Sequence, residues 1–279
     1  MDNGAETSPG KGPEISHDRS DKTDSRNPAQ PPLTSSAGKM PHSDVPFPNF
    51  DNPADLLGGD PAKILKEGAS ARVEEAIRDQ SELSEGERLT PAEKLKKMDP
   101  SMPDVMAKGL GSIVDLTQGK ETIDDSVKDQ MIQKFQTIQI PQEDARALLD
   151  NTTALSDQQK DEIVSKLKPR SESPQQAEPT PDEQKQMTAT GEVAQEHLMK
   201  MNDIVDKTPA KDEKSKKQQS ELKKKIAKLS ERFNVFMHPD DPLRTWAARG
   251  GKTLFYVLLT AFIVLSAEMS LIHRMASKK

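Results

Sequence analysis

Cysteine and aromatic residues are the scarcest features of this 279-residue chain, which has no Cys, one Trp, one Tyr and seven Phe. Without cysteine there is no disulfide, thiolate metal site or cysteine nucleophile, which suits a reducing compartment. Six of the nine aromatic residues lie in the last 47 positions, so residues 1–232 hold only Phe47, Phe50 and Phe135. Because only 32% of the chain is hydrophobic, the composition excludes a large globular catalytic domain.

Charge and proline predict the fold class. The chain is 31% charged and contains 21 Pro, and such a sequence buries too little apolar surface to offset the entropy of ordering its backbone. We therefore expect a mostly disordered protein with short α-helices, a marginal small helical bundle in the middle, a candidate coiled coil and a single C-terminal transmembrane helix.

Motifs for enzymatic chemistry or nucleic-acid binding are also missing. The five histidines are scattered, and Gly109-Leu110-Gly111 lacks the third glycine and the preceding strand of a dinucleotide loop. The net charge of −6 is spread over blocks of opposite sign, with no dominant basic face. We expect no catalytic, cofactor or metal site, no enzymatic activity and no nucleic-acid partner.

The strongest signal is an apolar run from Thr253 to Ile272, TLFYVLLTAFIVLSAEMSLI. Twenty helical residues at about 1.5 Å each span the roughly 30 Å hydrocarbon layer. The alternative, a buried helix of a soluble protein, needs a core around it, and the composition argues that no such core exists. We therefore predict a membrane anchor that includes Thr253, Leu254, Phe255, Tyr256, Val257, Phe262 and Ile272.

The flanks of this run predict its orientation. Trp246 is placed as an interfacial anchor, and the flank charges are Arg249 and Lys252 before the span and Arg274, Lys278 and Lys279 after it. Residues 211–232 carry nine Lys or Arg, against three in residues 273–279, which favours a cytosolic N-terminal side. The start carries neither a secretory signal nor a mitochondrial presequence. We expect post-translational insertion, as in tail-anchored proteins.

Polar residues interrupt the distal half of the span. Glu268 is expected to reach water or the basic tail, with an intramembrane contact as the alternative. Ser266 and Ser270 form a weak small-xxx-small dimerisation signal.

The N-terminal region reads as an acidic, proline-rich arm. Residues 1–60 contain nine Pro, ten acidic and five basic residues, which is typical of disorder. An apolar island within it supplies a candidate partner motif, formed by Phe47, Phe50, Leu56 and Leu57. A hydrophobic lead-in to the next helix is the alternative.

Helix signals follow the arm. Asp60-Pro61, Thr90-Pro91-Ala92-Glu93, Ser156–Gln159 and Thr180–Glu183 are N-terminal capping patterns. Ile123, Val127, Met131, Phe135 and Ile138 form one apolar stripe. Residues 122–167 therefore predict a marginal three-helix unit, small enough to need help from other helices or a partner.

Heptad spacing marks the region before the anchor. Met187, Ala194 and Met201 share a heptad phase with a second block, the candidate coiled coil of Leu222, Ile226, Leu229, Phe233 and Phe236. Pro209 separates the two blocks. Residues 187–236 are expected to support homo- or hetero-oligomers, and the alternative for residues 211–236 is a basic amphipathic helix on an anionic leaflet.

These segments give a predicted order along the chain. It is a disordered arm (1–60), short helices (61–121), the three-helix unit (122–167), a Pro-rich linker (168–181), a helical and basic juxtamembrane region (182–236), a membrane-proximal turn (237–252), the anchor (253–272) and a basic tail (273–279).

Three functions fit this order. The favoured one is a tail-anchored, cytosol-facing adaptor or tether that recruits soluble partners to an organelle surface. A SNARE-like fusion component also places heptads before an anchor, but Pro209, Pro239 and Pro242 break the continuity that force transmission needs. A viral membrane-anchored scaffold is the third. The short span and basic tail slightly favour the mitochondrial outer membrane over the endoplasmic reticulum.

Overall fold

The computed structural model describes residues 60–78, 88–173, 178–210, 212–238, 245–246 and 248–277, with side chains described through Met269. The predicted partner motif, Phe47, Phe50, Leu56 and Leu57, lies outside the described residues, as do Lys278 and Lys279. Ile272 and Arg274 belong to a described helix, but their side chains lie outside the description.

The described part of the chain contains nine α-helices and no β-strand. They are α2 (Pro61–Ile77), α3 (Pro91–Met98), α4 (Asp104–Thr117), α5 (Asp125–Thr137), α6 (Gln142–Leu149), α7 (Asp157–Ser165), α8 (Pro181–Lys207), α9 (Glu213–Met237) and α10 (Gly251–Ser277), with a short 3-10 turn, η3 (Arg170–Glu172), after α7.

The helix starts follow local capping chemistry. The Asp60 carboxylate accepts a hydrogen bond from the Ala62 N–H at 3.0 Å. Thr90, Ser156 and Thr180 each form a complete capping box with the residue three positions on, at the starts of α3, α7 and α8. The capping predictions are confirmed, because they depend only on neighbours in sequence.

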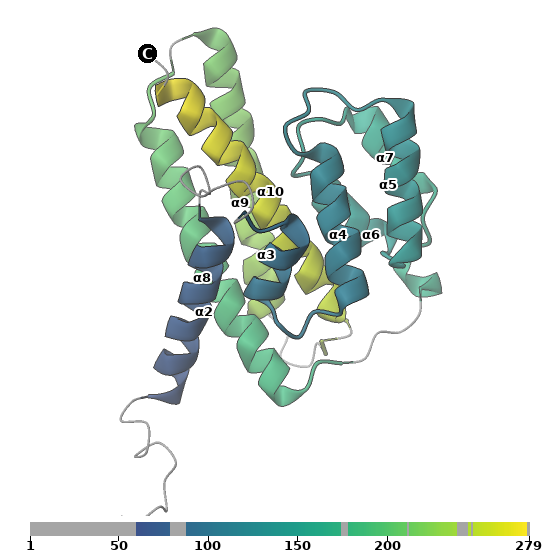
Figure 1. Cartoon of the computed structure of the whole chain (residues 1–279), viewed down its shortest axis with the longest axis vertical. Coiled ribbons are helices and arrows are strands. Elements are labelled where there is room, and N and C mark those ends of the chain that lie inside the picture. Colours follow the sequence, from purple (N-terminus) through teal and green to yellow (C-terminus); the bar gives the residue numbers. More distant parts are fainter. Residues whose placement is uncertain are drawn as a thin grey trace, which may run out of the picture. The chain divides into compact units, whose positions relative to one another are not determined.

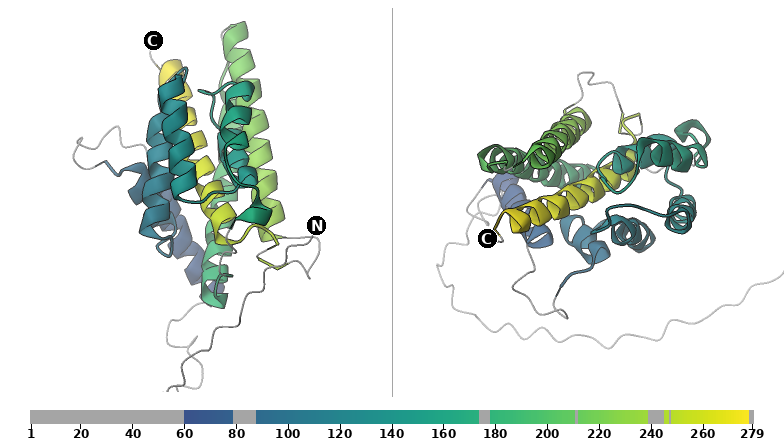
Figure 2. Two further views of the ribbon diagram at one scale, coloured as in Figure 1. Left: turned by 90° about the vertical axis from the view of Figure 1, so that its right-hand side faces the viewer. Right: turned by 90° about the horizontal axis from the view of Figure 1, so that it is seen from above.

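One hydrophobic core joins all nine helices, and α10 is at its centre. Helix α10 packs against α6, α9, α8, α3 and α4. In Figures 1 and 2 it runs between the long α8–α9 pair and the shorter helices that follow α3. The apolar C-terminal run therefore supplies the surface on which the amphipathic helices assemble.

This arrangement corrects the expected fold class. The prediction of α-helices is confirmed, but that of a mostly disordered chain with only short helices is wrong for the described residues, where α8 and α10 have 27 residues each and α9 has 25. The composition argument assigned the apolar residues of α10 to lipid. Counted as core, they give the other helices a surface to bury against.

The predicted three-helix unit corresponds to α5, α6 and α7. Met131 and Phe135 of the predicted stripe are fully buried, with Ile123 and Ile138 at 4% and 6% exposure. These helices contribute to the same core as α10 and do not form a separate unit.

Two glycines provide a matched test of this packing. A Cβ at Gly111 in α4 would lie 2.6 Å from the Ala92 backbone nitrogen in α3, whereas a Cβ at Gly68 in α2 would have nothing within 4 Å. We expect Gly111→Ala to lower the free energy of unfolding by about 1–3 kcal/mol and Gly68→Ala to raise it by about 0.5–1 kcal/mol. Urea unfolding measures both, and equal effects would contradict the close α3–α4 approach.

Candidate membrane anchor

Helix α10 carries the apolar run that the sequence singles out. Residues Gly251–Met269 form a 19-residue segment that is long and apolar enough to cross a membrane, alone in this respect among the helices that the structure describes. The helix begins two residues before the predicted start at Thr253 and continues past Ile272 to Ser277. The prediction of one membrane-length apolar helix at this end of the chain is confirmed.

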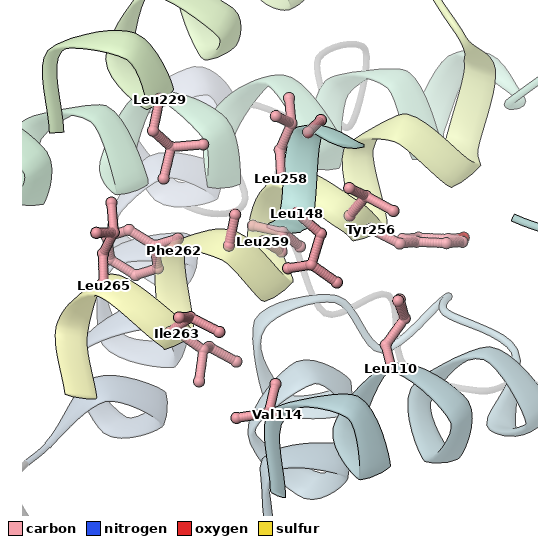
Figure 3. Packing of buried hydrophobic residues seen from close by; sticks show 14 of the residues in the cluster. Leu110, Val114, Leu148, Leu229, Tyr256, Leu258, Leu259, Phe262, Ile263 and Leu265 are labelled. Carbon is pink, nitrogen blue, oxygen red and sulfur yellow. The ribbon is translucent and has the colours of Figure 1, made fainter. Parts of the chain in front are cut away.

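Other helices of the protein cover most of this segment, about two thirds of which is buried (67%). Thr253, Phe255, Tyr256, Val257 and Phe262 are at most 2% exposed, and Leu254 is half-buried. Figure 3 shows Leu110 and Val114 of α4, Leu148 of α6 and Leu229 of α9 gathered around Leu259, Phe262 and their neighbours. A core that covers most of this helix therefore exists, contrary to the expectation from composition.

An aromatic cluster lies at the N-terminal end of α10. The Phe236 ring stacks on Phe255 with centroids 5.6 Å apart and meets Trp246 edge-on at 5.1 Å. The Arg249 guanidinium carbon lies 5.0 Å from the Trp246 ring centroid, in cation–π geometry. Trp246 and Arg249, predicted as interfacial groups, here join α9 to the start of α10.

A glycine pair forms the turn into α10. Gly250 and Gly251 have φ of 105° and 57°, in the left-handed region that glycine adopts without steric cost. The Arg170 guanidinium packs against Gly250, where an added Cβ would meet it at 2.3 Å. Arg170 is itself ion-paired with Asp144 in the first turn of α6.

Asp144 is a buried carboxyl with a strongly altered pKa. It is 1% exposed, and burial raises its pKa to about 7, with Glu143 adding to the rise and Arg170 opposing it. Because the folded-state pKa exceeds the ordinary value, the folded protein binds this proton more tightly than the unfolded chain does. The stabilisation is complete below the ordinary pKa and is lost as the pH rises towards 7.

The raised pKa of Asp144 predicts that the free energy of unfolding depends on pH. With the folded-state pKa at about 7, Asp144 contributes about 1.4 kcal/mol more to stability at pH 6 than at pH 8. Asp144→Asn should remove that difference, while other titrating groups, such as His197, act equally on both proteins. Urea unfolding at the two pH values measures it, and an unchanged pH dependence in the variant would contradict the raised pKa of this buried carboxyl.

Glu268 has protein partners at the distal end of the apolar segment. Its Oε1 accepts hydrogen bonds from the Thr153 N–H at 3.2 Å and the Thr153 hydroxyl at 3.1 Å. Its Oε2 lies 3.6 Å from Lys225 Nζ of α9, and the two side chains are 22% and 16% exposed. Glu268 was expected to reach water or the basic tail. In this fold it contacts the α6–α7 loop and α9 instead.

Lys252 has an ion-pair partner at the opposite end. Its Nζ lies 2.8 Å from Glu183, the residue that completes the α8 capping box. Lys252 together with Thr180 holds the pKa of Glu183 below its ordinary value. A flank charge predicted to sit at the lipid surface thus joins α10 to the start of α8.

The predicted coiled-coil residues of α9 all face the core. Leu222, Ile226, Leu229, Phe233 and Phe236 are at most 3% exposed. Helix α9 packs against α8 and α10, and the Gln219 side-chain amide donates to the Thr208 carbonyl at 2.7 Å at the α8–α9 turn. The apolar stripe is confirmed, and it pairs within the chain. Its use in oligomers stays a prediction.

The basic face of α9 binds the C-terminal end of α6. Lys228 Nζ lies 2.6 Å from the Asp150 carboxylate, Arg232 lies 3.2 Å from the same group, and Arg232 also donates to the Ala147 carbonyl at 2.9 Å. Burial alone would raise the pKa of Asp150, but Lys228, Arg232 and Arg146 hold it below the ordinary value.

No protein-family model, curated protein or solved structure matches this chain.

The partners of α10 were not predictable from the sequence. Thr153, Lys225 and Glu183 reach Glu268 and Lys252 from loops and helices far away in sequence, and no local spacing marks them. Among the described residues no group of three or more His, Asp or Glu side chains is placed to hold a metal ion.

Proposed function

We propose that the protein is a membrane-anchored adaptor or tether, held by α10 with its preceding residues in the cytosol, which recruits soluble partners to an organelle surface. The observation that carries the proposal is the 19-residue apolar segment Gly251–Met269. The positive charge before it supports a cytosolic N-terminal side, as in the tail-anchored class.

Surface charge on α9 supports a second contact with lipid. Lys214, Lys216 and Lys217 are exposed in the first turns of this helix, where cations attract anionic headgroups. This contact is electrostatic and uses exposed lysines, so it does not require the apolar stripe of α9, which faces α8 and α10, to enter the leaflet.

The soluble partners are proposed from sequence. Phe47, Phe50, Leu56 and Leu57 supply apolar anchors in a polar arm, the pattern of a short peptide motif. A basic tail with Arg274, Lys278 and Lys279 favours the mitochondrial outer membrane over the endoplasmic reticulum.

A SNARE-like component or a viral scaffold is the alternative. A fusion helix must present its heptad stripe to partner chains, and α9 packs against α8 of the same chain as well as against α10. The contact with α8 does not involve α10, and it weighs towards the adaptor.

Localisation with protease protection tests the proposal. An N-terminally tagged full-length protein should resist carbonate extraction from organelle membranes, and protease added to intact organelles should remove residues before α10 and leave a small C-terminal fragment. Complete carbonate extraction would contradict the anchor.

The orientation has a separate readout at the sequon Asn151-Thr152-Thr153. Asn151 is 2% exposed and its amide donates to the Ala147 carbonyl at 2.7 Å. Glycan on Asn151 would place this region in a lumen and contradict the cytosolic assignment.

A further inference from the structure

The apolar surface of α10 can be covered in two ways, by lipid or by the other helices of the bundle. A bilayer-spanning helix has lipid around it, whereas here α3, α4, α6, α8 and α9 surround the same residues. Phe255, Leu258, Leu259 and Phe262 are fully buried in the bundle. These side chains cannot contact lipid and the bundle core at once, so membrane insertion requires the bundle to release α10.

We propose that the bundle is a closed state which stores the anchor, and that polar contacts at the two ends of α10 form a latch that breaks before insertion. The distal latch is Glu268 with Thr153 and Lys225, and the proximal latch is Lys252 with Glu183. This inference rests on the proposed anchor function and describes how access to it is regulated.

The distal latch affects the free energy of both the closed bundle and the membrane-inserted state. In the bundle the Glu268 carboxylate receives two hydrogen bonds from Thr153 and faces the Lys225 ammonium. In a bilayer the same carboxylate loses these partners, and a charge within a membrane span is costly. Glu268 therefore favours the closed state through satisfied contacts inside and an unfavourable environment outside.

Lys225 is placed to depend on this contact. Burial lowers its pKa, and the attraction of Glu268 opposes that shift, with Lys160 and Glu221 also acting on the group. When α10 leaves, Lys225 loses the acidic partner that compensates its partial burial. The cost of opening is thus shared between α9 and α10.

Two hydroxyl groups of α10 are suited to transfer into lipid. The Thr260 hydroxyl donates to the Tyr256 carbonyl at 2.8 Å, and the Ser266 hydroxyl donates to the Phe262 carbonyl at 2.8 Å. These bonds stay within the helix when it moves into lipid. The turn at Gly250 and Gly251 adds conformational freedom at the point where α10 must swing away.

Carbodiimide crosslinking reads the latch directly in the natural, full-length chain, because this reagent condenses an amine and a carboxylate that already touch. We expect Lys225–Glu268 and Lys252–Glu183 crosslinks in detergent-free buffer, identified by mass spectrometry. Adding vesicles of phosphatidylcholine with a minority of phosphatidylserine should reduce both crosslinks in step with the appearance of a protease-protected C-terminal fragment.

Variants outside α10 separate the latch from the hydrophobicity of the anchor. Thr153→Val and Lys225→Met leave the sequence of the span unchanged. Each should raise the ratio of membrane-inserted to soluble protein by about tenfold, which is the effect of losing a hydrogen bond to a charged group. Lys224→Met, at an exposed neighbouring position on α9, is the matched control and should leave the ratio unchanged.

A charge-reversed double variant distinguishes loss of the latch from simple unfolding of the bundle. Lys225→Glu combined with Glu268→Lys restores an ion pair in the bundle while keeping a charge in the span, so it should return the ratio towards wild type. A circular dichroism melt in buffer checks that each variant retains the folded bundle.

The remaining outcomes overturn the inference in distinguishable ways. Inserted protein that keeps its Lys225–Glu268 crosslink contradicts the exclusion of the two states, and unchanged insertion of the latch variants contradicts the latch. If the protein inserts into vesicles but forms neither crosslink in buffer, the closed state is contradicted and the anchor proposal is not. Crosslinks unaffected by vesicles, with no insertion of any variant, remove the anchor proposal and this inference with it.

Discussion

A truncated protein that ends at Met237 is expected to lose the cooperative unfolding transition of the full-length chain. Eight large apolar side chains of α10 are at most 5% exposed: Phe255, Tyr256, Val257, Leu258, Leu259, Phe262, Ile263 and Leu265. At about 1.5 kcal/mol for each buried side chain, their loss amounts to about 12 kcal/mol, comparable with the roughly 5–15 kcal/mol that stabilises a typical domain.

Thermal melting followed by near- and far-ultraviolet circular dichroism measures this effect. The truncated protein should retain some helix but show no sharp transition and elute with an expanded radius, whereas full-length protein should melt cooperatively. A truncated protein with the same sharp transition would mean that α10 is dispensable for the core.

Phe135→Ala is expected to destabilise the whole bundle. Phe135 is fully buried in α5, and truncating a buried phenylalanine costs about 3–5 kcal/mol through lost burial and a residual cavity. Because α5 shares the core with the other helices, the whole unfolding transition should shift, and not only the signal from residues 122–167.

Val235→Ala is the matched control, since this α9 side chain is 50% exposed and its loss should change stability by less than about 0.5 kcal/mol. Urea unfolding of both variants at one temperature gives the comparison. Equal midpoints would place Phe135 outside the shared core.

Local features of the fold were predictable from sequence. The capping residues Asp60, Thr90, Ser156 and Thr180 bond to groups within three positions, and the stripes of α5 and α9 repeat at helical spacing. These signals depend on short stretches of chain, and the structure confirms them.

The assembly of the helices was not predictable in the same way. The composition argument treated the apolar run around Phe255 and Phe262 as lipid-facing, so the rest of the chain seemed to lack a core. An apolar helix satisfies the same length and hydropathy criteria whether lipid or protein covers it. The partner of Glu268 was equally hidden, because Thr153 is 115 positions away.

Hydrogen exchange of the full-length protein tests the central claim, that one helix serves as bundle core and membrane anchor. In detergent-free buffer the amides of residues 255–265 should exchange as slowly as the slowest amides of α8 and α9, through global unfolding. With vesicles present, residues 255–265 should stay protected while α6 and α9 exchange faster, having lost α10 from their buried faces. Protection of residues 255–265 only in the presence of vesicles, with α6 and α9 unchanged, would contradict the account.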